Sequence, residues 1–424
     1  IAVCGPNADE ASFALTHYGP VAVEVTTVLE GIKQQVKEGT KVTYTKGCDL
    51  VDANWPESEI ISYPLTAEEK TEIQKAVDNV KESDVAVVVL GGGIRTCGEN
   101  KSRTSLDLPG HQQQLLEAIV ATGKPVVLVL INGRPLSINW ADKFVPAILE
   151  AWYPGSQGGT AIAEALFGDY NPGGKLTVTF PKTVGQIPFN FPAKPASQVD
   201  GGQTPGMKGN QSRINGPLYP FGYGLSYTTF EYSNLQLSSP VITDKEPVTV
   251  TCKIKNTGTR SGDEVVQLYT RDVVSSVTTY EKNLRGFERV HLEPGETKEV
   301  SFQLLPRDFQ LLNKDNHWVV EPGMFQIMIG ASSEDIRLKK GLEIRAYGQA
   351  SANEIIESDP RDFISACKNK SHIIHVVDGD YSTTWKGEKG EYISFELAEN
   401  AKVDRINVAW KLSLIHISEP TRLA

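Results

Sequence analysis

Two apolar runs constrain the fold of this chain more than any other feature. Asp84–Leu90 and Val126–Ile131 have the length of a strand and contain no polar residue beyond Asp84 itself. A half-exposed strand alternates apolar with polar residues, whereas a continuous apolar run is typical of a parallel strand covered on both faces. A third strand is expected at Ala147–Trp152, which is apolar except for Glu150. These runs predict a mostly parallel sheet.

Helical patterns alternate with these strands. Thr66 and Glu69 fit a capping box, and apolar residues follow at helical spacing up to the first strand. Pro109 opens a second helix, and a third is expected at 161–167. Strands and helices in repeated alternation describe an α/β sandwich with helices on both faces of the sheet. We place this domain at residues 1–191.

The pattern changes after the α/β region. Residues 192–218 are rich in Pro, Gly, Gln, Ser and Asn without periodicity, which predicts a linker or an active-site loop. Apolar and polar residues then alternate, most clearly at Val248–Ile254. Short alternating strands predict an all-β antiparallel sandwich at residues 219–347. Residues 350–411 contain further strand patterns that stop before a β domain could close, so we expect a multidomain chain ending in a truncated β module.

Both ends of the chain are unusual. Ile1 opens a strand-like segment without a methionine or a charged-then-apolar leader, so we expect a fragment whose signal region is absent. Residues 412–424 read like the translation of a sequencing adapter, and we expect them to be an artefact. The alternative is an ordinary amphipathic tail.

Charge and composition exclude several classes of partner. The formal net charge is −10 and the basic residues are dispersed, which disfavours nucleic acid. No apolar run approaches the ~20 residues that a spanning helix needs, so we expect no membrane span. The five cysteines are odd in number and lack CxxC spacing, which argues against a disulfide framework or a zinc site.

One carboxylate has the position of a catalytic group. Glu99 lies in the loop Gly93–Gly110, directly after the Asp84–Leu90 strand, and parallel sheets bind ligands beyond the carboxyl ends of their strands. Taken alone, a loop glutamate is an ordinary solvated surface residue. Arg103 either pairs with Asp107 or orients Glu99 by charge-assisted hydrogen bonds; otherwise it is an exposed cation of little energetic weight.

An ordered set of motifs runs along the chain. Its members are Ile1–Ala8, Gly98–Gly110, Tyr153–Gly159, Leu166–Leu176, Tyr219–Tyr227, Glu264–Tyr269 and Leu284–Val290. Together they resemble the C-terminal half of glycoside hydrolase family 3, of the Bacteroidetes β-glucosidase and β-xylosidase type. The resemblance covers residues 1–347. It implies an α/β sandwich followed by a fibronectin-III-like domain, with the family's N-terminal (β/α)8 barrel missing from this chain.

The resemblance also assigns roles. Members of the family carry their nucleophilic aspartate on the barrel and their acid/base glutamate on a loop of the α/β sandwich. That loop reads Glu-Gly-x-Asp-Arg, and Glu99 and Arg103 keep its two ends at the same offset. Asn100 stands in place of the glycine and Ser102 in place of the aspartate. These departures affect the loop's hydrogen bonding more than the role of Glu99.

The implied function is that of a retaining, exo-acting β-glycosidase that releases terminal glucose or xylose from plant oligosaccharides. Glu99 supplies the acid/base carboxylate and catalysis needs no cofactor. Because the nucleophile is missing, we expect the fragment alone to be inactive. The resemblance implies a periplasmic or secreted location. The alternatives are a non-catalytic carbohydrate-binding or assembly protein and, less favoured because Thr96 replaces the third glycine of a dinucleotide loop, a nucleotide-binding protein.

Two further expectations concern residues away from the acid/base motif. Asp378, Asp380 and Thr383 resemble the calcium loop of discoidin-like carbohydrate-binding modules, since carboxylates around a tight turn suit a hard cation. The alternative is an Asx-rich turn without metal.

Near the loop, we expect His111 to be a helix cap or surface residue. Trp152 and Tyr153 either stack on a sugar or pack in the core, and we favour the core.

Overall fold

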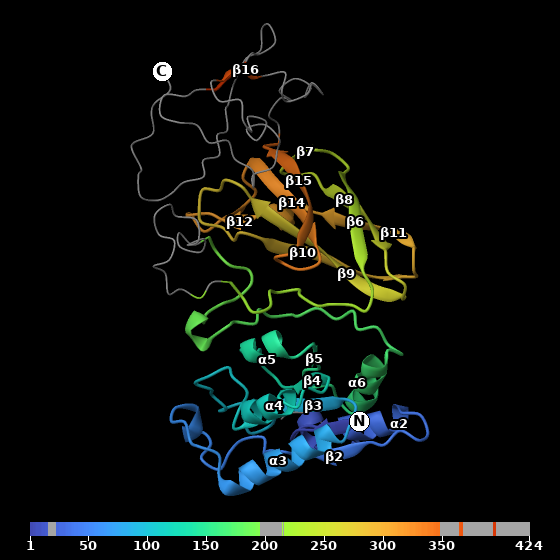
Figure 1. Ribbon diagram of the computed structural model, residues 1–424. Helices are drawn as coiled ribbons and strands as arrows, with labels where there is room; N and C mark the ends of the chain where they lie inside the picture. Colours follow the sequence, from blue (N-terminus) through green and yellow to red (C-terminus); the bar gives the residue numbers. More distant parts are fainter. Residues whose placement is uncertain (16–22, 196–213, 215, 348–363, 368–392, 396–424) are drawn as a thin grey trace. The chain divides into compact units, whose positions relative to one another are not determined.

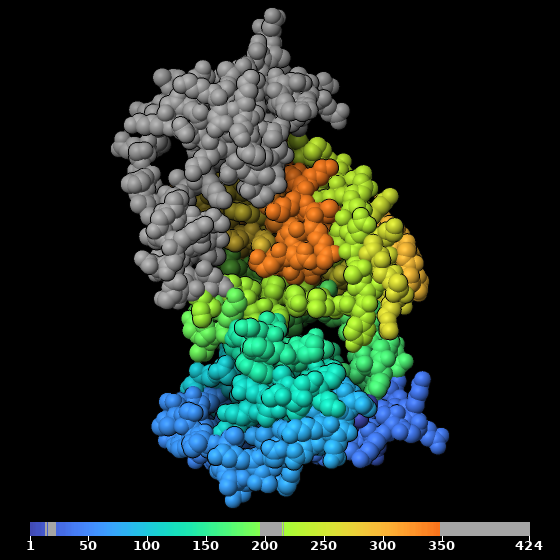
Figure 2. Space-filling model, in the orientation of Figure 1, coloured from blue at the N-terminus to red at the C-terminus, as the bar shows by residue number. Residues whose placement is uncertain are grey.

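The computed structural model describes residues 1–15, 23–195, 214, 216–347, 364–367 and 393–395, which are coloured in Figure 1; Figure 2 shows the surface of the residues up to 347 in the same colours. They divide into two compact units. The first, Ile1–Phe191 with Arg213–Tyr227, is called the α/β unit below. The second, Pro192–Ser212 with Thr228–Ala424, is called the β unit. Each is described by itself.

The α/β unit contains a five-stranded sheet in the order β2-β1-β3-β4-β5. Every neighbouring pair is parallel, as the apolar runs predict. The chain passes from β1 to β2 in one direction and then to β3 on the other side of β1, so the strand order reverses between β1 and β3. The strands are β1 (Ala2–Cys4), β2 (Thr43–Thr45), β3 (Ala86–Gly91), β4 (Val126–Ile131) and β5 (Ala147–Glu150).

Helices cover both faces of this sheet, and the side chains of β3 show why its sequence is apolar throughout. Val88 and Leu90 lie in one core cluster with residues of α3, α4 and α5, whereas Val87 and Val89 lie in another with residues of α2 and α6. Since successive side chains point to opposite faces, both sets must be apolar. The helices are α1 (Ala11–Ala14), α2 (Val28–Gln35), α3 (Ala67–Lys81), α4 (Gln112–Val120), α5 (Asn139–Phe144) and α6 (Gly158–Phe167) (Figure 1).

Local sequence signals set the ends of the helices. Thr66 and Glu69 form the predicted capping box at the start of α3: the Glu69 amide donates to Thr66 Oγ1 (3.1 Å), and the Thr66 amide donates to the Glu69 carboxylate (2.8 Å). The apolar stripe of α3 is buried, as its helical spacing predicts. Helix α6 ends at Gly168, which has a left-handed φ of 81°.

Two boundaries in this unit differ from those the sequence suggests. β5 ends at Glu150 rather than Trp152, because Trp152 has a left-handed φ of 51° that no strand can continue. A single bridge joins Phe180 to Tyr219. That bridge belongs to a segment, 213–227, that is part of the α/β unit, whereas the sequence places the start of the second sandwich at Tyr219.

The β unit is a sandwich of two sheets, in the orders β10-β9-β14-β15-β7 and β11-β8-β6. Strand β8 alternates buried with less buried residues, as its period of two predicts. All pairs within the two sheets are antiparallel except β15 with β7. The strands are β6 (Phe230–Leu237), β7 (Val241–Thr243), β8 (Val248–Asn256), β9 (Gly262–Asp272), β10 (Asn283–Leu292), β11 (Thr297–Leu304), β12 (Leu311–Leu312), β13 (Trp318–Val319), β14 (Gly323–Gly330) and β15 (Ile336–Arg345).

Little of the C-terminal region is described. β16 (Ile364–Cys367) pairs antiparallel with β17 (Ile393–Phe395). Residues 412–424 lie outside the described residues, as do the proposed calcium ligands Asp378, Asp380 and Thr383. Within the described part of the chain, no helix combines the length and the apolar character that crossing a membrane requires.

Candidate active site

The carboxyl edge of the parallel sheet is the place where this fold offers a site. Ligands of such sheets bind where the strand order reverses, which here is between β1 and β3. A pocket of about 420 Å³ lies at this point. It is lined by residues that follow β1, β2 and β3 in the chain, namely Pro6, Glu10, Lys46, Asp49, Leu50, Val51, Asp52, Ala53 and Arg95.

Glu99 lies on the same loop as Arg95, and its side chain is exposed. Its two neighbours have left-handed backbone conformations, with a φ of 132° at Gly98 and 60° at Asn100. Asparagine is the residue that most readily replaces glycine at such a φ. The substitution at position 100 therefore keeps the turn that carries Glu99.

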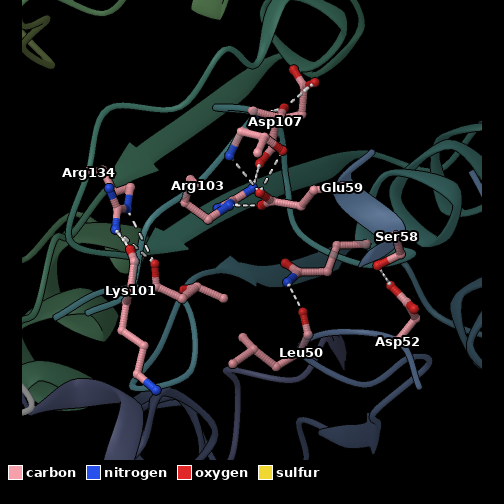
Figure 3. A network of polar contacts seen from close by, with 12 residues as sticks. Leu50, Asp52, Ser58, Glu59, Lys101, Arg103, Asp107 and Arg134 are labelled. Carbon is pink, nitrogen blue, oxygen red and sulfur yellow. Dashed lines mark hydrogen bonds and ion pairs between the residues drawn. The ribbon is translucent and has the colours of Figure 1, made fainter. Parts of the chain in front are cut away.

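Arg103 is anchored in a buried ion pair. Its Nε donates to the carboxylate of Glu59, and the two side chains are only 4% and 6% exposed. The guanidinium carbon also lies 5.1 Å from the centre of the Trp55 ring, a cation–π contact. Figure 3 shows Arg103 and Glu59 facing one another. Burial, with the nearby charge of Arg134, lowers the pKa of Arg103 to about 10, so it stays charged at neutral pH.

The partner of Arg103 is not the one expected from the sequence. Asp107 contributes its backbone carbonyl, to which Arg103 Nη2 donates at 3.0 Å. The carboxylate of Asp107 instead accepts from Ser105 Oγ at 2.6 Å. A backbone acceptor leaves the identity of the side chain at position 107 free, which is why the sequence could not reveal this contact.

Glu59 joins two loops. It ends the short 3-10 helix η1 (Glu57–Glu59), which follows β2, and it also accepts from the amide and hydroxyl of Thr104 at 2.8 and 3.1 Å. The C-terminal side of the Glu99 loop is therefore fixed to the loop that follows β2.

Arg134 holds the other side of the Glu99 loop. It follows β4, and its guanidinium donates to the carbonyl of Thr96 from Nε (3.3 Å) and Nη2 (3.1 Å). Nη2 also donates to the carbonyl of Lys101 at 2.5 Å (Figure 3). These carbonyls lie three residues before and two residues after Glu99.

Behind Arg134, two further polar residues lie at the carboxyl ends of β4 and β5, Asn132 buried and Glu150 partly buried. Asn132, 1% exposed, accepts from the Arg134 amide (3.2 Å) and donates to both carboxylate oxygens of Glu150 (2.9 and 3.2 Å). The Trp152 amide donates to Glu150 at 3.0 Å. Burial raises the pKa of Glu150 to about 8, against these hydrogen bonds, which lower it.

Trp152 and His111 make contacts with neighbouring parts of the fold. Trp152 packs edge-on against Phe180, with ring centres 5.8 Å apart. His111 occupies the N-cap position of α4, as expected of a helix cap, but it is only 8% exposed and its side chain makes no capping hydrogen bond. Its Nδ1 lies 2.8 Å from a Glu69 oxygen and its Nε2 lies 3.2 Å from the carbonyl of Tyr63. His111 therefore ties α4 to α3.

Four residues of this network were not identified from the sequence. Asn132 and Arg134 directly follow β4, and Glu150 ends β5. Polar residues at the carboxyl ends of neighbouring parallel strands meet at one edge of the sheet, so a signal for these three was present. Glu59 carried no such signal, because its segment has no periodic pattern.

We find no metal site in the part of the chain that the structure describes: no group of three or more His, Cys, Asp or Glu side chains there could hold an ion.

Models of two protein families match the chain. Residues 1–227 match the glycosyl hydrolase family 3 C-terminal domain, and residues 264–333 match the fibronectin type III-like domain. The first match covers the whole α/β unit and with it the loop that carries Glu99.

Curated relatives agree with these matches. A β-xylosidase of Formosa agariphila is 44% identical over 80% of this chain and 45% of its own length. A periplasmic β-glucosidase of Salmonella typhimurium is 40% identical over 80% of this chain and 46% of its own length. This chain thus spans about half the length of the curated relatives that it matches.

Solved structures give the same result. A β-glucosidase from Erythrobacter marinus superposes with a TM-score of 0.71 at 38% identity, over 81% of this chain and 46% of the other. A β-glucosidase from Listeria innocua in complex with isofagomine gives a TM-score of 0.70 at 33% identity, with the same coverage.

Proposed function

This chain belongs to glycoside hydrolase family 3, and on that premise we propose that it forms part of a retaining, exo-acting β-glycosidase. The substrates are oligosaccharides with a terminal β-linked glucose or xylose. Relatives named β-xylosidase and β-glucosidase support this substrate class. The relative named periplasmic supports an export route for the complete protein.

Glu99 is the acid/base residue in this proposal. It protonates the leaving oxygen while a nucleophilic carboxylate attacks the anomeric carbon, and it then removes a proton from the water that releases the sugar. Retaining enzymes hold the two carboxyl groups about 5 to 5.5 Å apart. We assign the nucleophile to a part of the complete enzyme outside this chain, so the chain alone is expected to be inactive.

The observation that carries the proposal is the placement of Glu99. Glu99 is an exposed residue of the loop that leaves β3, and β3 borders the point where the strand order reverses. Two arginines fix the loop, Arg103 through a buried ion pair and Arg134 through part-buried hydrogen bonds. An acid/base group has to reach a substrate and keep a defined position, and a fixed loop with an exposed carboxylate provides both.

The test is Glu99→Gln in the complete enzyme, assayed on two glycosides of the same sugar. We expect kcat/KM on an alkyl glycoside, whose leaving oxygen must be protonated, to fall by about 100- to 10,000-fold. The first step on a dinitrophenyl glycoside needs no acid and should fall far less, and azide should restore part of the turnover. Unchanged hydrolysis of the alkyl glycoside by Glu99→Gln would refute the assignment.

A further inference from the structure

The network behind the Glu99 loop suggests a residue that acts through Glu99. We propose that Arg134 is a positioning residue for the acid/base carboxylate: it closes residues 96–101 into a ring around one guanidinium and thereby sets where Glu99 points. This inference rests on the proposed function of Glu99.

The first argument is geometric. Arg134 donates to the carbonyls of Thr96 and Lys101, on either side of Glu99. Within the loop, the Lys101 amide donates to the Gly98 carbonyl at 3.2 Å. A single planar guanidinium with donors to both carbonyls limits the distance between them and the tilt of the segment, since its donors form a rigid fork. Lysine also has several donors, but its ammonium group rotates and lacks the planar fork, so it would not hold this geometry.

The second argument is that Arg134 is itself fixed. Its backbone amide donates to the side chain of Asn132, which is buried, and the side-chain amide of Asn132 is held by Glu150. The backbone amide of Asn132 donates to the Trp152 carbonyl at 3.2 Å, and this hydrogen bond joins the ends of β4 and β5. The Glu99 loop follows β3, but Arg134, which holds it, is positioned by residues at the ends of β4 and β5.

The third argument is a contrast with Arg103. Arg103 is neutralised by a buried carboxylate and is itself a residue of the loop, four positions after Glu99. No carboxylate pairs with Arg134 in the described ion pairs, and its side-chain hydrogen bonds there go to loop carbonyls. Arg103 contributes mainly to stability, whereas the hydrogen-bond donors of Arg134 hold the segment that carries Glu99.

The experiment compares Arg134→Lys and Arg134→Leu in the complete enzyme on an alkyl and a dinitrophenyl β-glycoside of the same sugar. For Arg134→Leu we expect kcat/KM on the alkyl glycoside to fall about 100-fold, the usual cost of misplacing a catalytic group by about 1 Å. The dinitrophenyl glycoside should lose less than about 10-fold, because its cleavage depends little on the acid. Arg134→Lys should fall between wild type and Arg134→Leu.

The matched control is Arg337→Leu in the β unit. Like Arg134, Arg337 donates to a backbone carbonyl, that of Phe230, at 2.8 Å. Its loss should leave the ratio of the two substrates unchanged. A readout independent of turnover is hydrogen exchange of the 96–101 amides, which should accelerate in Arg134→Leu while the amides of β3 keep their protection.

Two results would overturn the inference: an equal loss on both substrates, or a change in the substrate ratio for Arg337→Leu as large as for Arg134→Leu. Glu99→Gln, measured in parallel, separates this from the proposed function. If Glu99→Gln leaves alkyl glycoside hydrolysis intact, the acid/base assignment itself fails. If it abolishes hydrolysis while the Arg134 variants leave the substrate ratio unchanged, only the positioning role fails.

Discussion

Asn132 in the α/β unit and Asn256 in the β unit are buried to the same degree, and each lies at the end of a strand, yet their hydrogen bonds lead to different places. Asn256 donates to the carbonyls of Arg260 and Leu292 and accepts from Thr228 and Gly258. These partners are backbone groups and one hydroxyl, so the network is neutral. Asn256 thereby supplies hydrogen-bond partners to backbone groups of the turns around the ends of β8 and β10.

The network of Asn132 contains a cation, Arg134, and ends at an exposed loop. The side-chain amide of Asn132 binds the carboxyl group of Glu150, and its oxygen holds the backbone of Arg134, which reaches the loop around Glu99. Buried asparagine is therefore not informative by itself. What distinguishes a structural network from one that supports chemistry is the group at its far end. Four predictions test this distinction, in order of decreasing effect.

The largest effect is expected where the α/β unit buries a charge pair. Arg103→Met leaves the Glu59 carboxylate buried without its cation, which should lower the free energy of unfolding of the α/β unit by about 3–5 kcal/mol. Native-state hydrogen exchange of β3 and β4 amides measures it. The double variant Arg103→Met with Glu59→Leu should recover most of the loss, because an apolar pair avoids the unpaired charge. A double variant less stable than Arg103→Met would contradict this account.

The two asparagines give the next prediction. Asn256→Ala removes four hydrogen bonds in the β unit and should cost about 3 kcal/mol, read from the exchange of β8 amides. Asn132→Ala should cost about 2 kcal/mol in the α/β unit, and it should also accelerate exchange at residues 96–101. If the amides of residues 96–101 exchanged equally slowly in wild type and in Asn132→Ala, the proposed contrast between the two networks would be wrong.

The sequence predicted the frame of the α/β unit better than its site. Strand β4 and the cap of α3 follow from apolar runs and from a capping box, both of which are local signals. The Glu99 loop was found because it follows a buried strand. The pairing of Arg103 with Glu59 joins residues 44 apart, and Arg134 binds carbonyls that any residue could supply. Contacts of this kind leave no pattern in a single sequence.

A third prediction concerns pH and Glu150. Burial raises the pKa of this carboxyl to about 8 from 4.5. Between those values the folded chain holds a proton that the unfolded chain has released, so stability falls as pH rises, with a slope of at most ~1.4 kcal/mol per pH unit. Above about pH 8 the slope vanishes. Glu150→Gln has no such proton, so the stability of wild type relative to this variant should decline from pH 5 to pH 8. A difference that is flat, or grows, across this window would show that Glu150 is ionised in the fold.

The smallest effect is expected at an exposed titrating group of the β unit. Hydrogen bonds to Asp263 and Glu293 raise the pKa of His291 above 6.5. The protonated form is favoured by folding, so its contribution is complete below pH 6.5 and is lost as pH rises through the raised value. Because the side chain is 56% exposed, solvent screens the interaction, and His291→Gln should change stability by no more than about 0.5 kcal/mol. An NMR titration of the His291 ring measures the pKa directly. A larger effect here than at Glu150 would mean that surface charge, rather than burial at the sheet edge, dominates the pH response, and the contrast between the two units would then have to be abandoned.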